Sequence, residues 1–492
     1  MKQIIWAGIA LINNTLKTHW GVYVDNELIV DIDTFDNLKK RFPQVTIIGG
    51  ENFLLIPGLV NSHDHGRVVS TLGFNIPDNW LELWLLEFGK LPEIDPYLAA
   101  SIEGVCLLKS GVTTVAHSHN FTNWNNFYQE AEKTIKGYQD VGIRVAFHPP
   151  ISNQNFLVYT NEADLINSLP DSIAHDAKAY QKNLPISPER YFELLTELYQ
   201  NYHDLIHHLV KIQVSPVGGQ WCSDELIIQG TEWAKKHQTK VQMHLLETPY
   251  QRQYAYKFWG KSFVEHLDEL DVLGEWLTCA HMIWVEEQDL PILANRNVGI
   301  AHNPSSNLRL RSGIAPIAKM LGKGISLGIG LDGLALDDDG DFLREMRLAW
   351  TLSNQPGMNS DTIKPEQIWS MATKKGVEIT LGKNTPLGEL KVGNIADLVL
   401  VDYHQIPLRK RGIYNNLNCL RWLSKQQVKS VMVGGKWVVF EGECQTVNER
   451  HLEETLEEII RESNEQSAAS PENLLTQLQS YIYHFYQQWP LI

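Results

Sequence analysis

Short apolar runs rich in β-branched residues recur along the chain and alternate with stretches that favour helix. The segments between the runs contain strong helix formers, as in residues 191–202 and 262–273. Strands that alternate with helices form parallel β-α-β units, so this pattern predicts a closed (β/α)8 TIM barrel of the α/β class. The predicted strands cover residues 54–60, 111–116, 143–147, 210–214, 240–244, 276–281, 298–302 and 326–332.

The segments on either side of the predicted barrel, which spans 54–385, have a different pattern. In residues 1–53 and 386–448 apolar runs surround glycine turns, as antiparallel strands do. We expect these N- and C-terminal segments to form one small β-sandwich domain beside the barrel. Residues 449–492 predict a helical tail that packs on the core or on a second subunit. The predicted flanking strands are 4–12, its hairpin partner 21–24, 387–394, 396–401 and 431–439.

Composition and charge narrow the class of protein. The chain has 492 residues, of which 43% are hydrophobic, and its net charge of −16 argues against a nucleic-acid or anionic-membrane partner. The five cysteines are scattered and form no CxxC pair, so we expect a reducing compartment and a cytoplasmic location. The apolar run at 4–12 is short and no small-x-small cleavage site follows it, which favours a strand over a secretory signal. No run is long enough to span a bilayer.

Residues that bind metals follow several predicted strands at their C-terminal ends. His63 and His65 lie two positions apart after the first strand, and residues two apart on a strand point the same way. His244 and Asp332 end the fifth and eighth strands. Because a barrel has its active site at this face, we expect the four side chains to converge. Imidazoles with one carboxylate suit Zn²⁺ or Fe²⁺, and such an ion can make water a nucleophile.

Two further residues have positions suited to catalysis around such a metal. Glu247 follows His244 by three residues, where its carboxylate can hold the attacking water and move a proton to a leaving nitrogen. His281 ends the sixth predicted strand. Its imidazole is either a further metal ligand or a group that stabilises charge on the attacked centre.

A second histidine pair, His117 and His119, ends the second predicted strand. We interpret it as substrate-facing or as support for the metal ligands, and a direct metal role stays open as the alternative. His148 and His302 also end strands, and there the ordinary expectation is a hydrogen-bonded structural histidine.

Taken together, the motifs resemble those of the amidohydrolase superfamily, in particular its cytosine-deaminase-like branch. That branch contains S-adenosylhomocysteine/methylthioadenosine deaminases, guanine deaminases and triazine hydrolases. The matching motifs appear in the family order and cover most of the chain, so they are specific for the superfamily but weaker for the substrate. They are Pro57–His65 (PGLVNSHDH), 110–114 (SGVTT), 244–248 (HLLET), 302–307 (HNPSSN), 330–333 (GLDG) and 393–399 (GNIADLV).

The resemblance implies one divalent metal ion held by His63, His65, His244 and Asp332. Zn²⁺ is the expected ion, with Fe²⁺ or Mn²⁺ as alternatives. The fourth predicted strand, in residues 212–216, reads IQVSP and offers no lysine for carbamylation. The resemblance therefore implies a mononuclear site.

The resemblance also implies catalytic roles for three residues. Glu247 matches the glutamate that moves the water proton to a ring or imino nitrogen in the deaminases. Asp332 takes the second proton and helps to expel the amine, and His281 polarises the centre under attack. The reaction implied is attack of metal-activated water on an amidine-like carbon.

The loops after the predicted strands are expected to form the substrate pocket. Trp80, Trp84 and Trp221 can stack on a flat heterocycle, or they can pack in the core as buried tryptophans usually do. Arg67 and Arg309 can hold an anionic substrate group or form surface ion pairs.

The predicted function is hydrolytic deamination of a small-molecule substrate, an amino-substituted heterocycle of the purine, pterin, pyrimidine or triazine type. One alternative is hydrolysis of a guanidino, ureido or cyclic-amide C–N bond in secondary metabolism. Another is a non-catalytic metal-binding or scaffold protein, against which the complete set of ligands and acid–base groups argues. Family habit makes a homodimer plausible.

Overall fold

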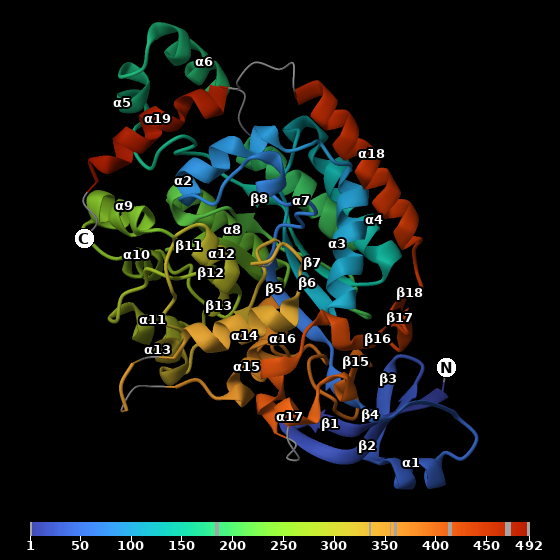
Figure 1. Cartoon of the computed structure of the whole chain (residues 1–492). Helices are drawn as coiled ribbons and strands as arrows, with labels where there is room; N and C mark the ends of the chain where they lie inside the picture. Colours follow the sequence, from blue (N-terminus) through green and yellow to red (C-terminus); the bar gives the residue numbers. More distant parts are fainter. Residues whose placement is uncertain are drawn as a thin grey trace.

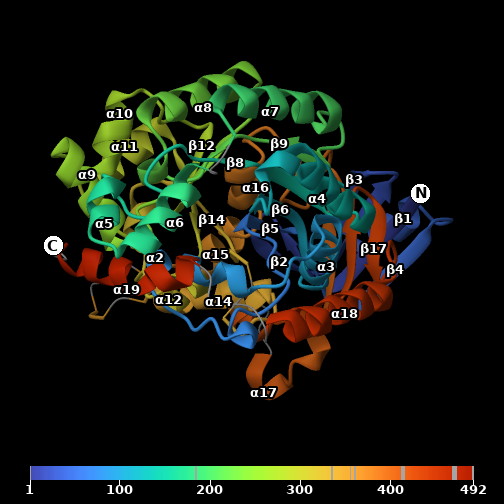
Figure 2. The same ribbon diagram turned by 90° about the horizontal axis from the view of Figure 1, so that it is seen from above.

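The computed structural model describes residues 2–182, 186–333, 336–354, 356–358, 362–411, 416–467 and 474–489. Its centre is a sheet of parallel strands that lie in the order predicted for a barrel (Figures 1 and 2). Val214 bridges to Val241 and Ile329 pairs with Asn61, so the sheet closes on itself. The strands are β5 (Leu59–Asp64), β6 (Val112–Ser118), β7 (Arg144–His148), β9 (Val210–Ile212), β11 (Val241–Leu245), β12 (Leu277–His281), β13 (Gly299–His302) and β14 (Ser326–Ile329).

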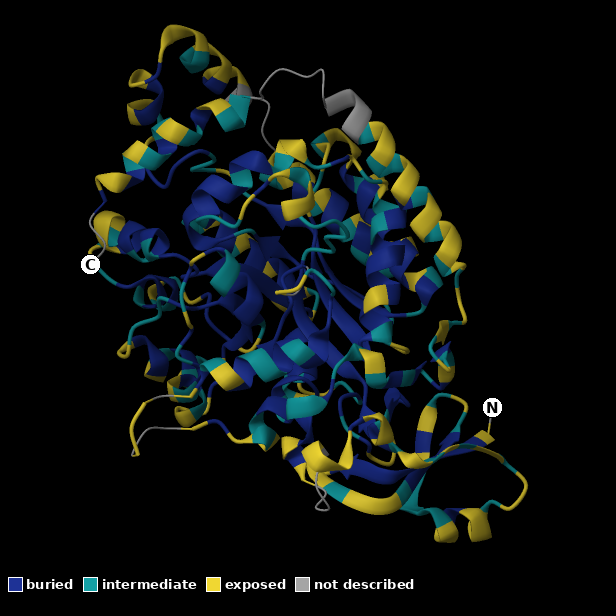
Figure 3. Ribbon diagram, viewed as in Figure 1, coloured by how far each residue is buried: buried dark blue, intermediate teal, exposed yellow. Residues whose placement is uncertain are grey.

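Helices surround this sheet and bury their apolar faces against it, which leaves the strands dark blue in Figure 3. In α4, for example, Phe127, Ala131, Ile135 and Tyr138 are buried at helical spacing, and Gly142 ends the helix with φ of 87°. The helices of the ring are α3 (Pro96–Lys109), α4 (Phe127–Val141), α7 (Pro188–Tyr202), α8 (Asp224–Lys236), α9 (Pro249–Trp259), α10 (Phe263–Glu269), α11 (Asp289–Arg296), α12 (Pro304–Arg309), α13 (Ile317–Gly322), α14 (Phe342–Leu352), α15 (Pro365–Met371) and α16 (Lys374–Thr380).

The first predicted strand is wrong in its extent. Residues 54–57 end β4 (Thr46–Pro57), which pairs with β1 and β15 outside the barrel. Gly58 separates β4 from β5, and a Cβ atom at this glycine would meet Thr113 Oγ1 at 2.1 Å. One apolar run therefore supplies strands to two different sheets, which hydrophobicity alone does not distinguish.

The N- and C-terminal segments join in a second sheet, in the order β18-β17-β16-β15-β4-β1-β2-β3. The predicted hairpin is confirmed, because Ile4 pairs with Tyr23 in antiparallel register. The strand predicted over 387–394 is wrong: these residues form turns and irregular backbone. The remaining elements here are β1 (Lys2–Ile12), β2 (Thr15–Asp25), β3 (Leu28–Thr34), α1 (Phe35–Arg41), β15 (Leu398–Asp402), α17 (Leu408–Arg411), β16 (Val428–Val433), β17 (Lys436–Phe440) and β18 (Glu443–Cys444).

A buried ion pair joins the barrel to this second sheet. Arg144, at the start of β7, donates from Nε and Nη2 to the two carboxylate oxygens of Asp397 at 2.7 and 2.8 Å. The backbone N–H of Gly434 also donates to Asp397, at 2.7 Å. A bidentate pair of this kind fixes relative orientation, because removal of either partner leaves a buried charge without compensation.

The tail, which was predicted to be helical, contains two helices, with residues 468–473 and 490–492 outside the described part. Helix α18 (Glu449–Ser467) packs along α3, and α19 (Leu474–Gln487) lies over α2 (Leu81–Trp84) and the long connection between β7 and β9 (Figure 1). That connection contains α5 (Glu162–Asn167) and α6 (Asp171–Lys182), and β8 (Pro150–Ile151) pairs with β10 (Ser215–Pro216). None of the described helices has the length and apolar character that a membrane span requires.

Candidate active site

The four predicted metal ligands lie together at the C-terminal end of the barrel strands. Asp332 Oδ1 is 3.2 Å from His63 Nε2 and 3.2 Å from His65 Nε2. His65 Nε2 is 3.1 Å from His244 Nε2. Ligand atoms bound at about 2.0–2.1 Å to a tetrahedral ion lie roughly 3.3 Å apart, so these separations match shared coordination of one ion.

The chemistry of the donors also fits a metal ion. His63 is fully buried, and its Nε2 atom has no hydrogen-bond partner among the described groups although it faces the Asp332 carboxylate. The two Nε2 atoms of His65 and His244 face each other, an arrangement that a cation between them makes favourable. The ligand atoms of His63, His244, His281 and Asp332 all lie within 4.8 Å of one another, and such buried nitrogen donors with one carboxylate form a site suited to a divalent metal ion.

Partners on the far side of the rings set their orientation. Gln242 Oε1 lies 2.8 Å from His63 Nδ1, and the Gln242 Nε2 donates to the backbone oxygen of Ser62 at 2.9 Å, which fixes the amide direction. His244 Nδ1 lies 2.6 Å from the backbone oxygen of Val217. Each ring therefore donates from Nδ1 and directs the lone pair of Nε2 toward the centre of the site.

Replacement of Gln242 by Leu is expected to weaken metal binding by about 10- to 100-fold, because His63 loses the acceptor that fixes its ring and tautomer. Competition with a chromogenic chelator measures this affinity. Gln213→Leu is the matched control: Gln213 is also buried, but its amide contacts His148 and Thr380 instead. Equal affinities in the Gln242 variant and the parent would show that Gln242 does not support the site.

Electrostatics in the site favour neutral imidazoles and an ionised carboxylate. Burial lowers the pKa of both His65 and His281 to about 4, and it lowers the pKa of His244 well below its usual value. Burial alone would raise the pKa of Asp332, but the imidazoles of His63 and His65 that face its carboxylate hold that pKa well below its usual range. At neutral pH the nitrogen lone pairs are thus available to a metal without prior loss of protons.

Glu247 and His281 lie beside this cluster. The Glu247 carboxylate oxygen is 3.7 Å from His281 Nε2, which is 3.9 Å from the second oxygen of Asp332. Glu247 is only 2% exposed, and burial, followed by the nearby charge of Asp332, raises its pKa well above the usual value. His281 Nδ1 contacts Asn307 Oδ1 at 3.0 Å. Glu247 and Asp332 are therefore two carboxyl groups with opposite proton affinities, a pairing suited to proton transfer.

Unusual backbone conformations mark two of these positions. His281 and Asp332 have φ of 75° and 62°, in the left-handed region that costs a side-chain-bearing residue of order 1 kcal/mol or more. The conformation of Asp332 is held because its N–H donates to the His63 carbonyl at 3.0 Å. At Gly330 a Cβ atom would meet the same carbonyl at 2.7 Å, so only glycine lets β14 approach His63 this closely.

The second histidine pair forms its own buried network. His117 Nε2 is 3.1 Å from His119 Nδ1, and the Tyr138 hydroxyl lies 2.9 Å from His117 Nδ1. His119 Nε2 faces Glu130 at 3.8 Å. The pair lies next to the metal-ligand cluster: Asp64 pairs with His117 across β5 and β6. Three of the four ring nitrogens of the pair contact protein groups, whereas His119 Nε2 has no hydrogen-bond partner among the described groups.

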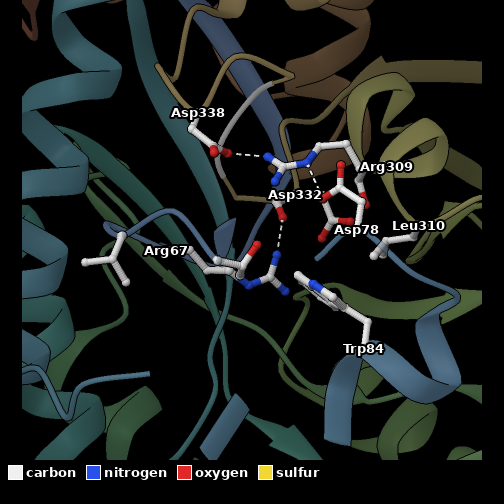
Figure 4. Close-up of a pocket in the computed structure, with 10 residues that line it drawn as sticks. Arg67, Asp78, Trp84, Arg309, Leu310, Asp332 and Asp338 are labelled. Carbon is white, nitrogen blue, oxygen red and sulfur yellow. Dashed lines mark hydrogen bonds and ion pairs between the residues drawn. The ribbon is translucent and has the colours of Figure 1, made fainter. Parts of the chain in front are cut away.

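Arg67, Trp84 and Arg309 line one cavity together with Asp332 (Figure 4). Arg67 Nη1 donates to the Asp332 backbone oxygen at 2.7 Å, and its guanidinium lies 5.0 Å from the Trp84 ring. Arg309 Nε donates to Asp78 at 3.0 Å. Three of the five predicted pocket residues thus meet beside the metal-ligand cluster.

Trp80 and Trp221 contact other aromatic side chains. Trp80 stacks on Tyr483 of α19 with ring centroids 5.9 Å apart. Trp221 meets Tyr159 edge to face at 5.6 Å. Among the described residues that line the cavity, neither tryptophan is present. Both pack between the barrel and the segments that cover it.

Sequence reasoning missed several residues of the site. Gln242 and Asn307, which orient His63 and His281, are isolated amides with no distinctive spacing. Asp78 and Asp338 both pair with Arg309 at the cavity wall. Asp338 follows the eighth predicted strand in the acidic run 337–339, and that position was the signal available in the sequence.

Sequence comparison finds curated relatives that match most of the chain. The chain is 29% identical over 454 residues to a 5'-deoxyadenosine deaminase of Methanosphaera stadtmanae, which covers 90% of this chain and 92% of that protein. It is 30% identical over 455 residues to a 5-methylthioadenosine/S-adenosylhomocysteine deaminase of Pyrococcus furiosus, with 89% and 97% covered.

Solved structures share the fold. One is an adenosine deaminase of Xanthomonas campestris with bound zinc (TM-score 0.78, 22% identity, 94% of this chain and 98% of that chain covered). Another is a mutant atrazine chlorohydrolase of Arthrobacter aurescens complexed with zinc and atraton (TM-score 0.79, 21% identity, 93% and 100% covered). Residues 54–438 match the amidohydrolase family, and over most of its length this chain is therefore a member of that family.

Proposed function

We propose that this protein is a metal-dependent hydrolytic deaminase that acts on an amino-substituted heterocycle. The observation that carries the proposal is the placement of a buried carboxyl group, Glu247, 3.7 Å from His281 and beside the converging metal donors. Hydrolysis of a C–NH₂ bond requires both an activated water and a group that moves its proton, and this site offers both.

The proposed metal ligands are His63, His65, His244 and Asp332, with zinc as the proposed ion. Zinc suits nitrogen donors with one carboxylate, and two structural neighbours were crystallised with it. When bound, a divalent ion supplies a water of low pKa and polarises the bond under attack.

The remaining steps belong to side chains of this chain. Glu247 holds the attacking water by hydrogen bonding and moves its proton to the ring nitrogen next to the amino-bearing carbon. His281 polarises that carbon, and Asp332 accepts the second proton and passes it to the departing amine. One water is consumed: the C–N bond breaks, a C–O bond forms, and ammonia leaves.

The substrate class follows from the curated relatives, which deaminate 5'-deoxyadenosine, 5-methylthioadenosine and S-adenosylhomocysteine. Their shared reaction supports a purine or a related amino heterocycle. In the proposed pocket Arg67, Arg309 and Trp84 face the substrate. His117 and His119 support the ligands from behind, and Trp80 and Trp221 shape the covering segments.

The domain organisation, the cellular location and the oligomeric state are also proposals. The residues 1–53 and 386–448, together with residues 54–57 of β4, are proposed to fold as a small β-sandwich beside the barrel, followed by a tail of 449–492. The sandwich is supported by one apolar cluster that contains side chains from both ends of the chain, such as Ile5 and Met432. A cytoplasmic location and a homodimer are further proposals.

The test is release of ammonia from a panel of purines, pterins, pyrimidines and triazines by protein loaded with Zn²⁺, Fe²⁺ or Mn²⁺. We expect at least one panel member to be deaminated with kcat/KM of about 10⁴ M⁻¹s⁻¹ or more, as for ordinary enzymes. Turnover restricted to guanidino or cyclic-ureide compounds would overturn the proposal in favour of a different C–N hydrolase.

A further inference from the structure

The Arg67 guanidinium is held rigidly at the wall of the cavity beside Asp332. Its Nη1 donates to the backbone oxygen of Asp332 at 2.7 Å, and its guanidinium carbon lies 5.0 Å from the ring of Trp84 (Figure 4). The ring of Phe88 is 5.5 Å away. Arg67 lies in the loop directly after the first barrel strand, next to the proposed ligand His65. The positive charge of Arg67 is thus fixed beside Asp332, close to the proposed reacting centre.

No carboxylate of the described residues lies within 4.0 Å of this guanidinium, and its Nε is buried with no acceptor among them. Arg309, which lines the same cavity, differs: it pairs with Asp78 at 3.0 Å and with Asp338. A buried cation without a close counter-ion is costly, and a charged donor left without an acceptor is more costly than a neutral one. Arg67 therefore keeps a buried donor for which the described protein groups supply no acceptor, although Asp78, Asp332 and Asp338 also line the cavity.

A second donor without an acceptor lies on the same wall. Trp84 is 6% exposed, and its indole Nε1 is buried with no partner among the described groups. Trp84 and Arg67 both line the cavity with Asp332. Buried donors are nearly always satisfied in proteins, so an acceptor supplied by a ligand is the simplest completion of this wall.

We propose that the substrate carries an anionic oxygen group, a carboxylate or an ionised ring oxygen, which accepts hydrogen bonds from Arg67 and Trp84. This inference rests on the proposed deaminase function and names the substrate class within it. Guanidinium groups recognise such oxygens specifically, and the ring of Trp84 beneath Arg67 keeps the donor geometry fixed. Selectivity follows because an analogue without the oxygen leaves both donors unpaired.

Two substrate pairs test the proposal and distinguish its two oxygen sources. Pterin-6-carboxylate against pterin tests the carboxylate, and guanine against 2-aminopurine tests the ring oxygen. In the metal-loaded enzyme we expect kcat/KM for the oxygen-bearing member of at least one pair to exceed that of its partner by about 100-fold. Ratios below about threefold in both pairs would overturn the proposal.

Variants test whether Arg67 causes the preference for the oxygen-bearing member of a substrate pair. In Arg67→Met the ratio within the selective pair is expected to collapse from about 100 to below about 5, and Trp84→Phe should reduce it by about tenfold. Arg252→Met is the matched control, because Arg252 also lies over a tryptophan, Trp284, at 5.0 Å but on α9. If Arg67→Met lowers kcat/KM equally for both members, Arg67 acts only by positioning Asp332 and the proposal falls.

Binding without turnover separates this proposal from the deaminase proposal. Zinc-loaded Glu247→Gln protein is titrated with each pair in a calorimeter, which reports affinity whether or not deamination occurs. Preferential binding of the oxygen-bearing member, lost in Glu247→Gln/Arg67→Met, supports the subsite even if no compound releases ammonia. Equal binding of both members would refute the subsite while leaving the deaminase proposal to its own test.

Discussion

Glu247→Gln protein is expected to bind a full complement of metal and to lose about 10²- to 10⁴-fold in kcat. Glutamine keeps the size and hydrogen bonding of the side chain but has no carboxylate to accept a proton from water. The Glu247 side chain lies 3.7 Å from His281 and is not one of the proposed metal ligands, which approach one another more closely. We therefore expect its replacement to leave metal binding intact. Metal analysis and steady-state kinetics on one preparation measure both quantities.

Glu232→Gln is the control for this result, since Glu232 is exposed on α8 and its replacement should change neither quantity. A Glu247→Gln enzyme with the parent rate would remove Glu247 from proton transfer. A variant that also lost its metal would mean that Glu247 supports the ligands, and the assigned role would then be wrong.

His63→Ala should bring the metal content far below one equivalent and lower kcat by about 10³-fold or more. His63 is fully buried and faces Asp332 at 3.2 Å, so its removal takes one nitrogen donor from the site and leaves a cavity in its place. Elemental analysis after dialysis against a weak chelator measures the bound metal.

His451→Ala serves as the comparison, because His451 is exposed on α18 and its loss should leave metal content unchanged. Circular dichroism of both variants checks that the fold is retained. A folded His63→Ala protein with one full equivalent of metal would place the ion elsewhere in the molecule.

The convergence of the proposed metal ligands could be predicted from the sequence because it follows from local rules of geometry. His63 and His65 point the same way through the two-residue period of a strand, and parallel strands in a barrel bring His244 and Asp332 to the same end. The separations of 3.1 to 3.2 Å among these groups are what such convergence produces.

Features that depend on distant partners were beyond sequence reasoning. Gln242 supports His63 across 179 residues, and a single glutamine in an apolar strand has no signature. The run 54–60 divides between two sheets because residues 54–57 belong to β4, which pairs with both β1 and β15. Arg67 and Arg309 have the same residue type and the same cavity, yet only the structure shows that Arg309 is neutralised by Asp78 and Asp338.

The most direct test of the central claim is turnover of a responsive heterocycle by the metal-loaded protein in water enriched in oxygen-18. If the protein is a hydrolytic deaminase, we expect one ammonia released for each product formed, and one labelled oxygen at the carbon that carried the amino group. Addition of a whole water molecule with ring opening and no ammonia, or turnover that persists after complete metal removal, would contradict it.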